Sequence, residues 1–131
     1  MIKTPLLVVT ETRDAFRKEK AWCKNFYAID EAGNYCGVFD EHAVARCLYG
    51  QVRYQTGEGL PIDPSVLNSI SYVAKKLWRD RPWSTSSYNI LTRVNDDLGY
   101  PGVMVLLNTT IAYLKGQVMW NEESEDFRNV R

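Results

Sequence analysis

Histidine and paired cysteines are what this chain has least of. Its 131 residues include one histidine, His42, and three cysteines, Cys23, Cys36 and Cys47. No C-x-x-C pair is present and the cysteine count is odd, which argues against a disulfide framework. A structural zinc site needs four ligands at suitable spacing, whereas His42 and Cys47 are five residues apart and do not share a helix face. We therefore expect no metal site.

Net charge is also missing, because 16 Lys and Arg residues balance 16 Asp and Glu residues. This balance excludes a protein held to nucleic acid by bulk electrostatics, and equally an acidic nucleic-acid mimic. The apolar run near the N-terminus, Leu6 to Val9, is too short for a secretory signal or a membrane span. We therefore expect a cytoplasmic protein that does not contact a membrane.

Catalytic and cofactor fingerprints are absent as well. The chain has no G-x-x-x-x-G-K-[ST] loop, no dinucleotide-binding glycine pattern, no H-E-x-x-H and no nucleophile elbow. The Gly57-Glu58-Gly59 segment lacks a following lysine, so it does not predict a phosphate loop. We therefore expect no cofactor, and these absences favour a protein that is not an enzyme.

What is present is the composition of a folded protein, with 45% hydrophobic and 24% charged residues. Hydrophobic periodicity predicts a mainly helical α+β fold, a single domain over residues 1–131 with four to five helices and a small β-hairpin near the N-terminus. The predicted helices cover 10–20, 41 to a glycine at 57 or 59, 64 to about 78, 85–94, and 101 to 116. Residues 117–131 are expected to form a partly disordered tail. Within it, Trp120 is expected to dock on the rest of the domain.

Capping residues set these predicted helix starts. The first helix has Thr10 or Thr12 as its cap, the second Asp40, and the fourth Ser84. Asp63 followed by a proline is the clearest start in the chain. Between the first two helices, aromatic and β-branched residues flank the polar turn 30–34, which predicts a hairpin.

The hairpin has a predicted register. If Ile29 faces Tyr35, then Cys36 lies near Ala28 and Cys23 lies outside the pair. A disulfide between Cys23 and Cys36 would then be geometrically wrong.

Four short elements together resemble a domain-of-unknown-function family of small bacterial and phage proteins. They are the tryptophan of Lys20-Ala21-Trp22, the Asp-x-x-Gly turn ending at Gly33, the Cys47-Leu48-Tyr49-Gly50 element and the Asn95-Asp96 turn before a final helix. The resemblance covers about residues 15–114 and implies the architecture and a bacterial or phage origin. It transfers no catalytic residue, because the family has no established activity. The motif positions Trp22, Gly33, Cys47, Gly50, Asn95 and Asp96 are therefore expected to be structural.

The residues themselves support structural roles for these positions. Cys47 falls on an apolar helical stripe, where a thiol behaves as a small hydrophobic group. Gly50 inside a helix costs about 1 kcal/mol relative to alanine, which suggests the close approach of another backbone. Asn95 and Asp96 are explained by capping and by the turn that they form.

Aromatic residues are abundant, with four tryptophans and eight tyrosines. A core of this size does not readily bury them all, and exposed aromatic residues mark partner contacts. The first hypothesis is therefore a non-enzymatic interaction protein that binds a protein partner or a second copy of itself. Trp83, Tyr100 and Trp120 are the residues hardest to assign to the core, and which of the aromatic side chains are exposed is left open.

Two alternatives stay open. The second hypothesis is a nucleic-acid-binding module that uses the basic and aromatic residues between positions 75 and 83. These residues are Lys75, Lys76, Arg79, Arg81 and Trp83. The third is a cysteine-dependent enzyme, although no base lies at a suitable spacing from Cys47.

Overall fold

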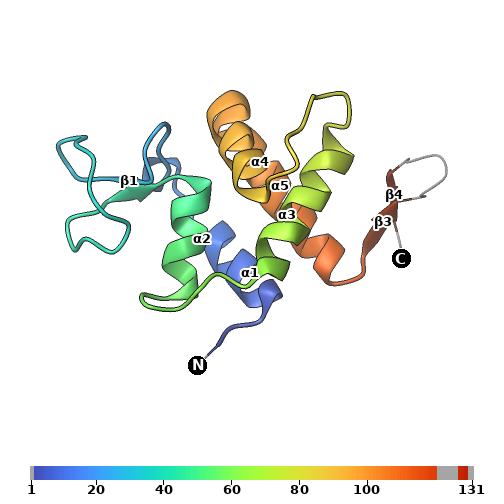
Figure 1. Ribbon diagram of the computed structural model, residues 1–131, viewed down its shortest axis with the longest axis horizontal. Coiled ribbons are helices and arrows are strands. Elements are labelled where there is room, and N and C mark those ends of the chain that lie inside the picture. The colour runs from blue at the N-terminus through green and yellow to red at the C-terminus, as the bar shows by residue number, and fades with distance from the viewer. Residues whose placement is uncertain (1, 121–126, 130–131) are drawn as a thin grey trace.

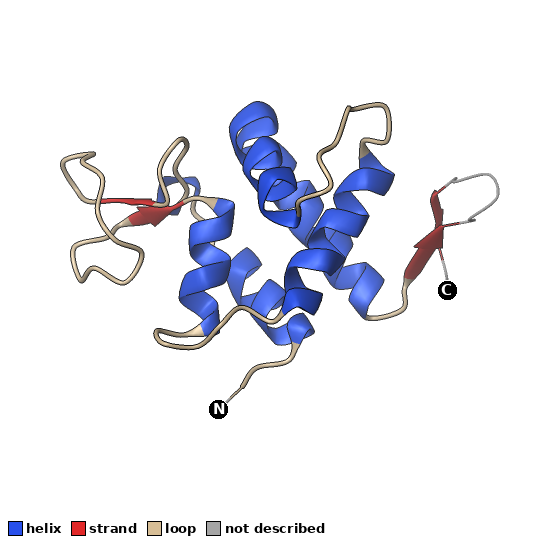
Figure 2. Cartoon of the chain, viewed as in Figure 1, coloured by secondary structure: helices blue, strands red, loops and turns tan. Residues whose placement is uncertain are grey.

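Helices surround a buried core in the computed structural model, which describes residues 2–120 and 127–129 (Figure 1). The helices are α1 (Pro5–Ala15), α2 (Leu48–Thr56), α3 (Pro64–Leu77), α4 (Ser87–Arg93) and α5 (Gly99–Leu114). The prediction of a mainly helical α+β fold is confirmed, and the strands are short (Figure 2). No helix in the described part of the chain is long and apolar enough to cross a membrane.

Helix α5 is the centre of the packing. It lies against α1 on one side and α3 on the other, while α4 packs on α3 and α2 on α1. The fully buried residues of α5 include Val103, Leu106 and Leu107. Burying each such side chain contributes about 1.5–3 kcal/mol, so this helix holds the others together.

Helix α3 forms as predicted. Asp63 accepts a hydrogen bond from the backbone N–H of Ser65 at 2.9 Å, and Pro64 occupies the first helical position. The expected apolar stripe is buried at Val66, Ile70, Val73 and Ala74. Local signals decide this element, because the cap, the proline and the periodicity all lie within it.

Helix α1 begins earlier than predicted. Its cap is Thr4, whose side chain accepts from the N–H of Leu7, and Pro5 stands at the first helical position. Thr12 is not a cap but a buried interior residue, and its hydroxyl donates to the carbonyl of Val8 at 2.8 Å. The Thr-Pro start is the same kind of signal that starts α3, and it outweighs Thr10 or Thr12.

Helix α4 differs from its prediction at the cap. Ser86 caps it instead of Ser84, and the Ser86 side chain accepts from the N–H of Asn89 at 3.3 Å. The Ser84 hydroxyl accepts from the N–H of Ser86 at 3.0 Å instead, which closes a turn just before the helix. Both Ser84 and Ser86 can serve as a cap, and the helix begins directly after Ser86.

The predicted hairpin register is confirmed, but the longer pairing of its first strand is with a later segment. Ile29 forms a bridge with Tyr35, and the N–H of Cys36 donates to the carbonyl of Ala28 at 3.1 Å. The strand β1 (Ala28–Ile29) nevertheless pairs along its length with β2 (Ala45–Arg46) in an antiparallel manner. The chain after Tyr35 turns away at 37–40, so a later segment supplies the second strand.

The predicted helix from Glu41 is wrong for the same reason. Asp40 accepts from the N–H of His42 at 2.7 Å, which closes a turn and not a helix. Val44 is exposed and does not join the core. Helix α2 starts at Leu48 instead, and of the two glycines predicted to end it, Gly57 does so, with a φ of 113°.

A π-helical turn, η2 (Val94–Leu98), joins α4 to α5 where a loop was predicted. Val94 and Asn95 are buried in this turn. Gly99, with a φ of 71°, then starts α5 two residues before the predicted Pro101. Wide π-turns of this kind occur within otherwise regular helices and are frequent at functional sites.

The C-terminal segment contains a strand pair that the sequence did not predict. Strand β3 (Val118–Trp120) pairs with β4 (Phe127–Asn129) in an antiparallel manner. The predicted docking of Trp120 is confirmed, because 5% of it is exposed and its ring packs on Tyr72 and Tyr113. The acidic stretch expected to fray, 122–126, lies outside the described residues.

Candidate functional site

Asn95 lies where α2 and η2 meet the segment that precedes β1, residues 22–27, which we call the N-terminal loop. Its side-chain oxygen accepts from the indole N–H of Trp22 at 2.6 Å and from the backbone N–H of Leu48 at 2.9 Å. Its amide nitrogen donates to the carbonyl of Cys23 and to Asp96 Oδ1, both at 3.1 Å. Both acceptor positions and both donors of the amide are therefore used, as a side chain with 1% exposure requires. We call these contacts the Asn95 network.

Cys47 and Gly50 lie beside this network. Cys47 is the residue that caps α2, and its Sγ accepts from the N–H of Gly50 at 3.3 Å. The predicted place of Cys47 on a helical stripe is therefore wrong, although the residue is buried. The predicted close approach at Gly50 is present, because a Cβ at this position would collide with the carbonyl oxygen of Tyr27.

Asp96 ties the N-terminal loop to η2. Its Oδ1 also accepts from the backbone N–H of Asn25 at 3.3 Å. Asn25 has a φ of 74°, a left-handed conformation that asparagine tolerates better than most residues. Five of the six family-motif positions thus converge, and the sixth, Gly33, lies apart in the turn closed by Asp30, with a φ of 85°.

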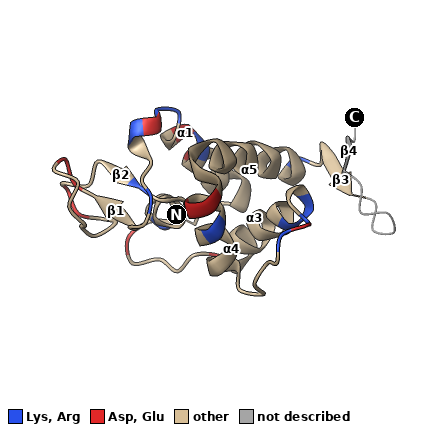
Figure 3. Ribbon diagram, turned by 90° about the horizontal axis from the view of Figure 1, so that it is seen from above, with Lys and Arg blue, Asp and Glu red and all other residues tan. Residues whose placement is uncertain are grey.

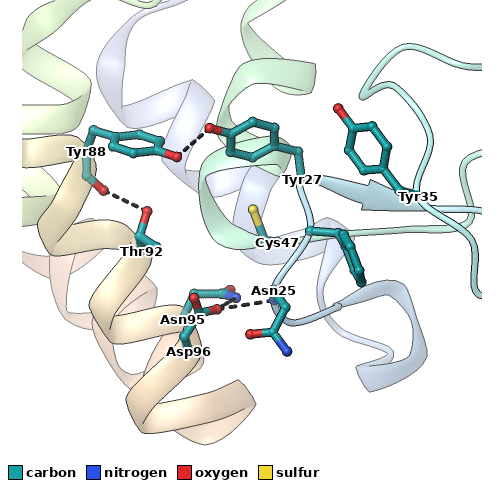
Figure 4. A pocket seen from close by; sticks show the side chains of 9 residues that line it. Asn25, Tyr27, Tyr35, Cys47, Tyr88, Thr92, Asn95 and Asp96 are labelled. Atoms are coloured by element: carbon teal, nitrogen blue, oxygen red, sulfur yellow. Dashed lines mark hydrogen bonds between the residues drawn. The ribbon is translucent and has the colours of Figure 1, made fainter.

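A cavity of about 250 Å³ lies beside these converging residues (Figure 4). We call it the aromatic pocket, and its lining is Asn25, Phe26, Tyr27, Tyr35, Cys47, Tyr88, Thr92, Asn95 and Asp96. Figure 4 shows the α4 residues Tyr88 and Thr92 along one side and Tyr35 along the other, with the sulfur of Cys47 between them. The pocket is therefore shared between the N-terminal loop and the α4–η2 helix.

The phenol groups of Tyr27 and Tyr88 form a hydrogen bond at the edge of the pocket. This hydrogen bond raises the pKa of Tyr27 to about 12. Tyr49 completes the group, with its ring centroid 4.8 Å from that of Tyr88 and edge-on to it. The three rings hold α2, α4 and the loop in one arrangement.

Replacing Tyr88 with phenylalanine is expected to return the pKa of Tyr27 towards the value of about 10 for free tyrosine. The measurement is an alkaline titration of tyrosine absorbance, in which the component that titrates near pH 12 in the native chain should move to lower pH. Because the folded-state pKa is the higher one, the stability from this pair is complete below about pH 10 and is lost as pH rises through about 12. A Tyr113→Phe control should leave that component in place, and an unchanged titration of Tyr88→Phe would contradict the assignment.

All three thiols are disfavoured as thiolates. Burial raises the pKa of Cys23 to about 12, and it raises the pKa of Cys47 and Cys36 as well. His42 pairs with Asp40, its Nδ1 lying 3.1 Å from the carboxylate. Within the described residues, no group of three or more His, Cys, Asp or Glu side chains is placed to hold a metal.

The predicted basic and aromatic surface lies at the C-terminal end of α3 (Figure 3). Lys75 and Arg79 are exposed there, whereas the ammonium of Lys76 lies 5.5 Å from the ring of Tyr72. Trp83 packs against the core and its indole N–H donates to the carbonyl of Trp78 at 2.8 Å. Arg81 lies 3.7 Å from Asp97. This surface keeps exposed cations, but its tryptophan is held by the protein's own backbone.

The sequence singled out Cys47, Asn95 and Asp96 but not the aromatic residues that line the pocket. Its surplus of tryptophans and tyrosines predicts exposed aromatic residues, and of the three candidates Trp83, Tyr100 and Trp120 none is among the exposed side chains. Tyr100 donates to the carbonyl of Phe16 at 2.5 Å, and Trp120 is buried. The pocket's exposed aromatic side chains lie instead on the loop around residues 26–35. The aromatic and β-branched flanks of the predicted hairpin are the sequence signal for that loop.

Comparison with known proteins adds no assignment to this geometry. No protein-family model, no curated protein and no solved structure matches the chain. The resemblance to a domain-of-unknown-function family therefore stays a prediction, and the convergence of its motif positions is a property of this chain.

Proposed function

We propose that the chain is a small cytoplasmic protein-interaction module, not an enzyme, whose partner binds over the mouth of the aromatic pocket. One observation carries the proposal. Phe26, Tyr27 and Tyr35 expose 47%, 39% and 61% of their surface beside a cavity. Aromatic side chains left in water next to a concave surface are typical of binding sites. We call these three residues the aromatic rim.

The rim is held in place before any partner arrives. The N–H of Asn25 is bonded to Asp96, and the carbonyl of Tyr27 accepts from the N–H of Cys47 at 3.1 Å. The rings of Phe26 and Tyr35 pack together with their centroids 6.0 Å apart. A preorganised surface loses less conformational entropy on binding, which favours this loop as a recognition element.

A capture experiment from the source cells tests the proposal. Wild-type chain and the Phe26→Ala/Tyr35→Ala variant would be used as baits, with bound proteins quantified by mass spectrometry. A partner of the rim should lose about 30-fold in affinity when two anchoring rings are removed. Val105→Ala, which truncates an exposed side chain on α5, is the matched control. A partner bound equally by all three baits would contradict the proposal.

Self-association is one form of the same proposal, with a second copy of the chain as partner. Light scattering at high concentration separates it, because the Phe26→Ala/Tyr35→Ala variant should then be monomeric while the wild type is not. A phage or bacterial origin stays a prediction, as do the nucleic-acid-binding and cysteine-dependent alternatives. The tethered indole of Trp83 and the raised pKa values of the thiols give these two alternatives less support.

A further inference from the structure

We propose that the aromatic pocket takes a lysine side chain of the partner, with Asp96 as its counter-charge and the surrounding rings as its walls. This inference rests on the proposed function and deepens it by naming the chemistry that the partner presents. Three features of the pocket support this inference: its charge, the carboxylate oxygen of Asp96 that accepts no hydrogen bond from the described residues, and its aromatic lining.

The lining contains one acidic residue, Asp96, and no lysine, arginine or histidine. Tyr27 and Cys47 do not add negative charge at neutral pH, because the ordinary pKa values of a phenol and a thiol lie above 7 and the pKa values of these two groups are raised further. The Asp96 carboxylate forms no ion pair with any cation in the part of the chain that the structure describes. A partly buried carboxylate without a counter-ion favours a cationic ligand.

The hydrogen bonds of Asp96 favour an ammonium over a guanidinium. Its Oδ1 already accepts from the N–H of Asn25 and from the amide of Asn95. Its Oδ2 has no hydrogen-bond partner among the residues described. An arginine fork gains most from a carboxylate that offers both oxygens in parallel. A carboxylate with one free oxygen suits the compact charge of a lysine ammonium instead.

The rings supply the rest of the site. Four rings line the cavity: those of Phe26 and Tyr35 pack with their centroids 6.0 Å apart, and those of Tyr27 and Tyr88 with their centroids 6.3 Å apart. A cation gains attraction within about 6 Å of an aromatic face, so a cavity lined by four rings offers an ammonium more than one such face. The cavity of about 250 Å³ has the volume of roughly eight water molecules, which is room for an alkylammonium with its hydration.

An NMR titration of the full chain tests this directly. The probes are Nα-acetyl-lysine methylamide, its Nζ-trimethylated form, the arginine equivalent, the norleucine equivalent and the tert-butyl isostere of the trimethylated form. The two lysine probes should shift the backbone signals of the residues around 25–27, 47 and 96. The uncharged norleucine and tert-butyl probes should not, because both lack the charge. Tighter binding of either lysine probe identifies whether the partner's lysine is methylated.

Variants separate charge from shape. Asp96→Asn keeps an oxygen that can accept from Asn25 and Asn95 but removes the charge, so binding of the lysine probes should weaken about fivefold or more. Glu58→Gln removes an exposed charge outside the pocket and should leave binding unchanged. Tyr35→Ala, at a largely exposed position, should also weaken binding and is a second test that does not risk the fold.

The outcomes are distinct from those of the capture experiment. Equal shifts with the charged and uncharged probes, or tighter binding of the arginine probe, would overturn the lysine assignment. No binding of any cation, with capture still dependent on Phe26 and Tyr35, would overturn this inference and leave the proposed function standing. Lysine binding with capture independent of these two residues would refute the proposed function and leave the cation site.

Discussion

Replacing Asn95 with alanine is expected to lower the free energy of unfolding by about 3 kcal/mol or more. The substitution removes all four hydrogen bonds of the Asn95 network at once. It leaves the indole N–H of Trp22, the N–H of Leu48 and the carbonyl of Cys23 without their partner. A buried polar group left unsatisfied costs about 1–3 kcal/mol, and several here share a single partner. Urea denaturation followed by circular dichroism measures the change.

The control for this prediction lies on the helix that precedes η2. Asn89 is exposed on α4, so Asn89→Ala should change the stability by less than about 0.5 kcal/mol. Asn95→Asp is a sharper variant, because it keeps the acceptor but replaces the donor to Cys23 with a second oxygen. It should also destabilise, and most strongly at pH values where the new carboxyl is ionised. A loss below about 1 kcal/mol for Asn95→Ala would show that the network contributes little.

Gly50→Ala is expected to destabilise the fold by about 2–3 kcal/mol, although alanine is the better helix former. The general preference for alanine within a helix is about 1 kcal/mol and would predict the opposite sign. At Gly50, however, the added Cβ collides with the carbonyl oxygen of Tyr27, which is a backbone atom and not the movable end of a side chain. The same carbonyl accepts from the N–H of Cys47, so it cannot move away without breaking a second interaction. Thermal unfolding and the NMR spectrum of the loop measure the effect.

A matched glycine separates this contact from general glycine effects. A methyl group added at Gly37 would meet no atom within 4 Å, and the backbone there has no positive φ. Gly37→Ala should therefore be neutral or slightly stabilising. We expect Gly50→Ala also to disturb the aromatic rim, because Tyr27 carries both the colliding carbonyl and one of the rim side chains. Equal stability of the two alanine variants would refute the proposed backbone contact.

Elements that local signals define were predictable from the sequence. Helix α3 has its cap, its proline and its periodicity within one stretch, and it forms as expected. Helix α2 does not start at Glu41, because Asp40 closes a turn and the following chain pairs with β1 instead. The two paired strands are separated along the chain, and the β-propensity of a segment does not predict which other segment it pairs with.

The candidate site shows the same difference between what local signals predict and what distant contacts decide. Short motifs single out Cys47, Gly50, Asn95 and Asp96 as structural positions, and the structure places all four at or beside the pocket. Their mutual contacts could not be predicted, because the partners come from separate segments. The aromatic rim was not predicted from the sequence, because the exposure of a side chain depends on which other segments pack against it.

The separation of those partners along the chain also orders the events of folding. Asn95 bonds to Trp22 and Leu48 across 73 and 47 residues, and closing loops of such length is slow compared with forming a helix. The aromatic pocket should therefore be among the last parts of the molecule to assemble. A chain that is still folding would not display the rim in its final geometry, so under the proposed function only the finished protein would bind a partner.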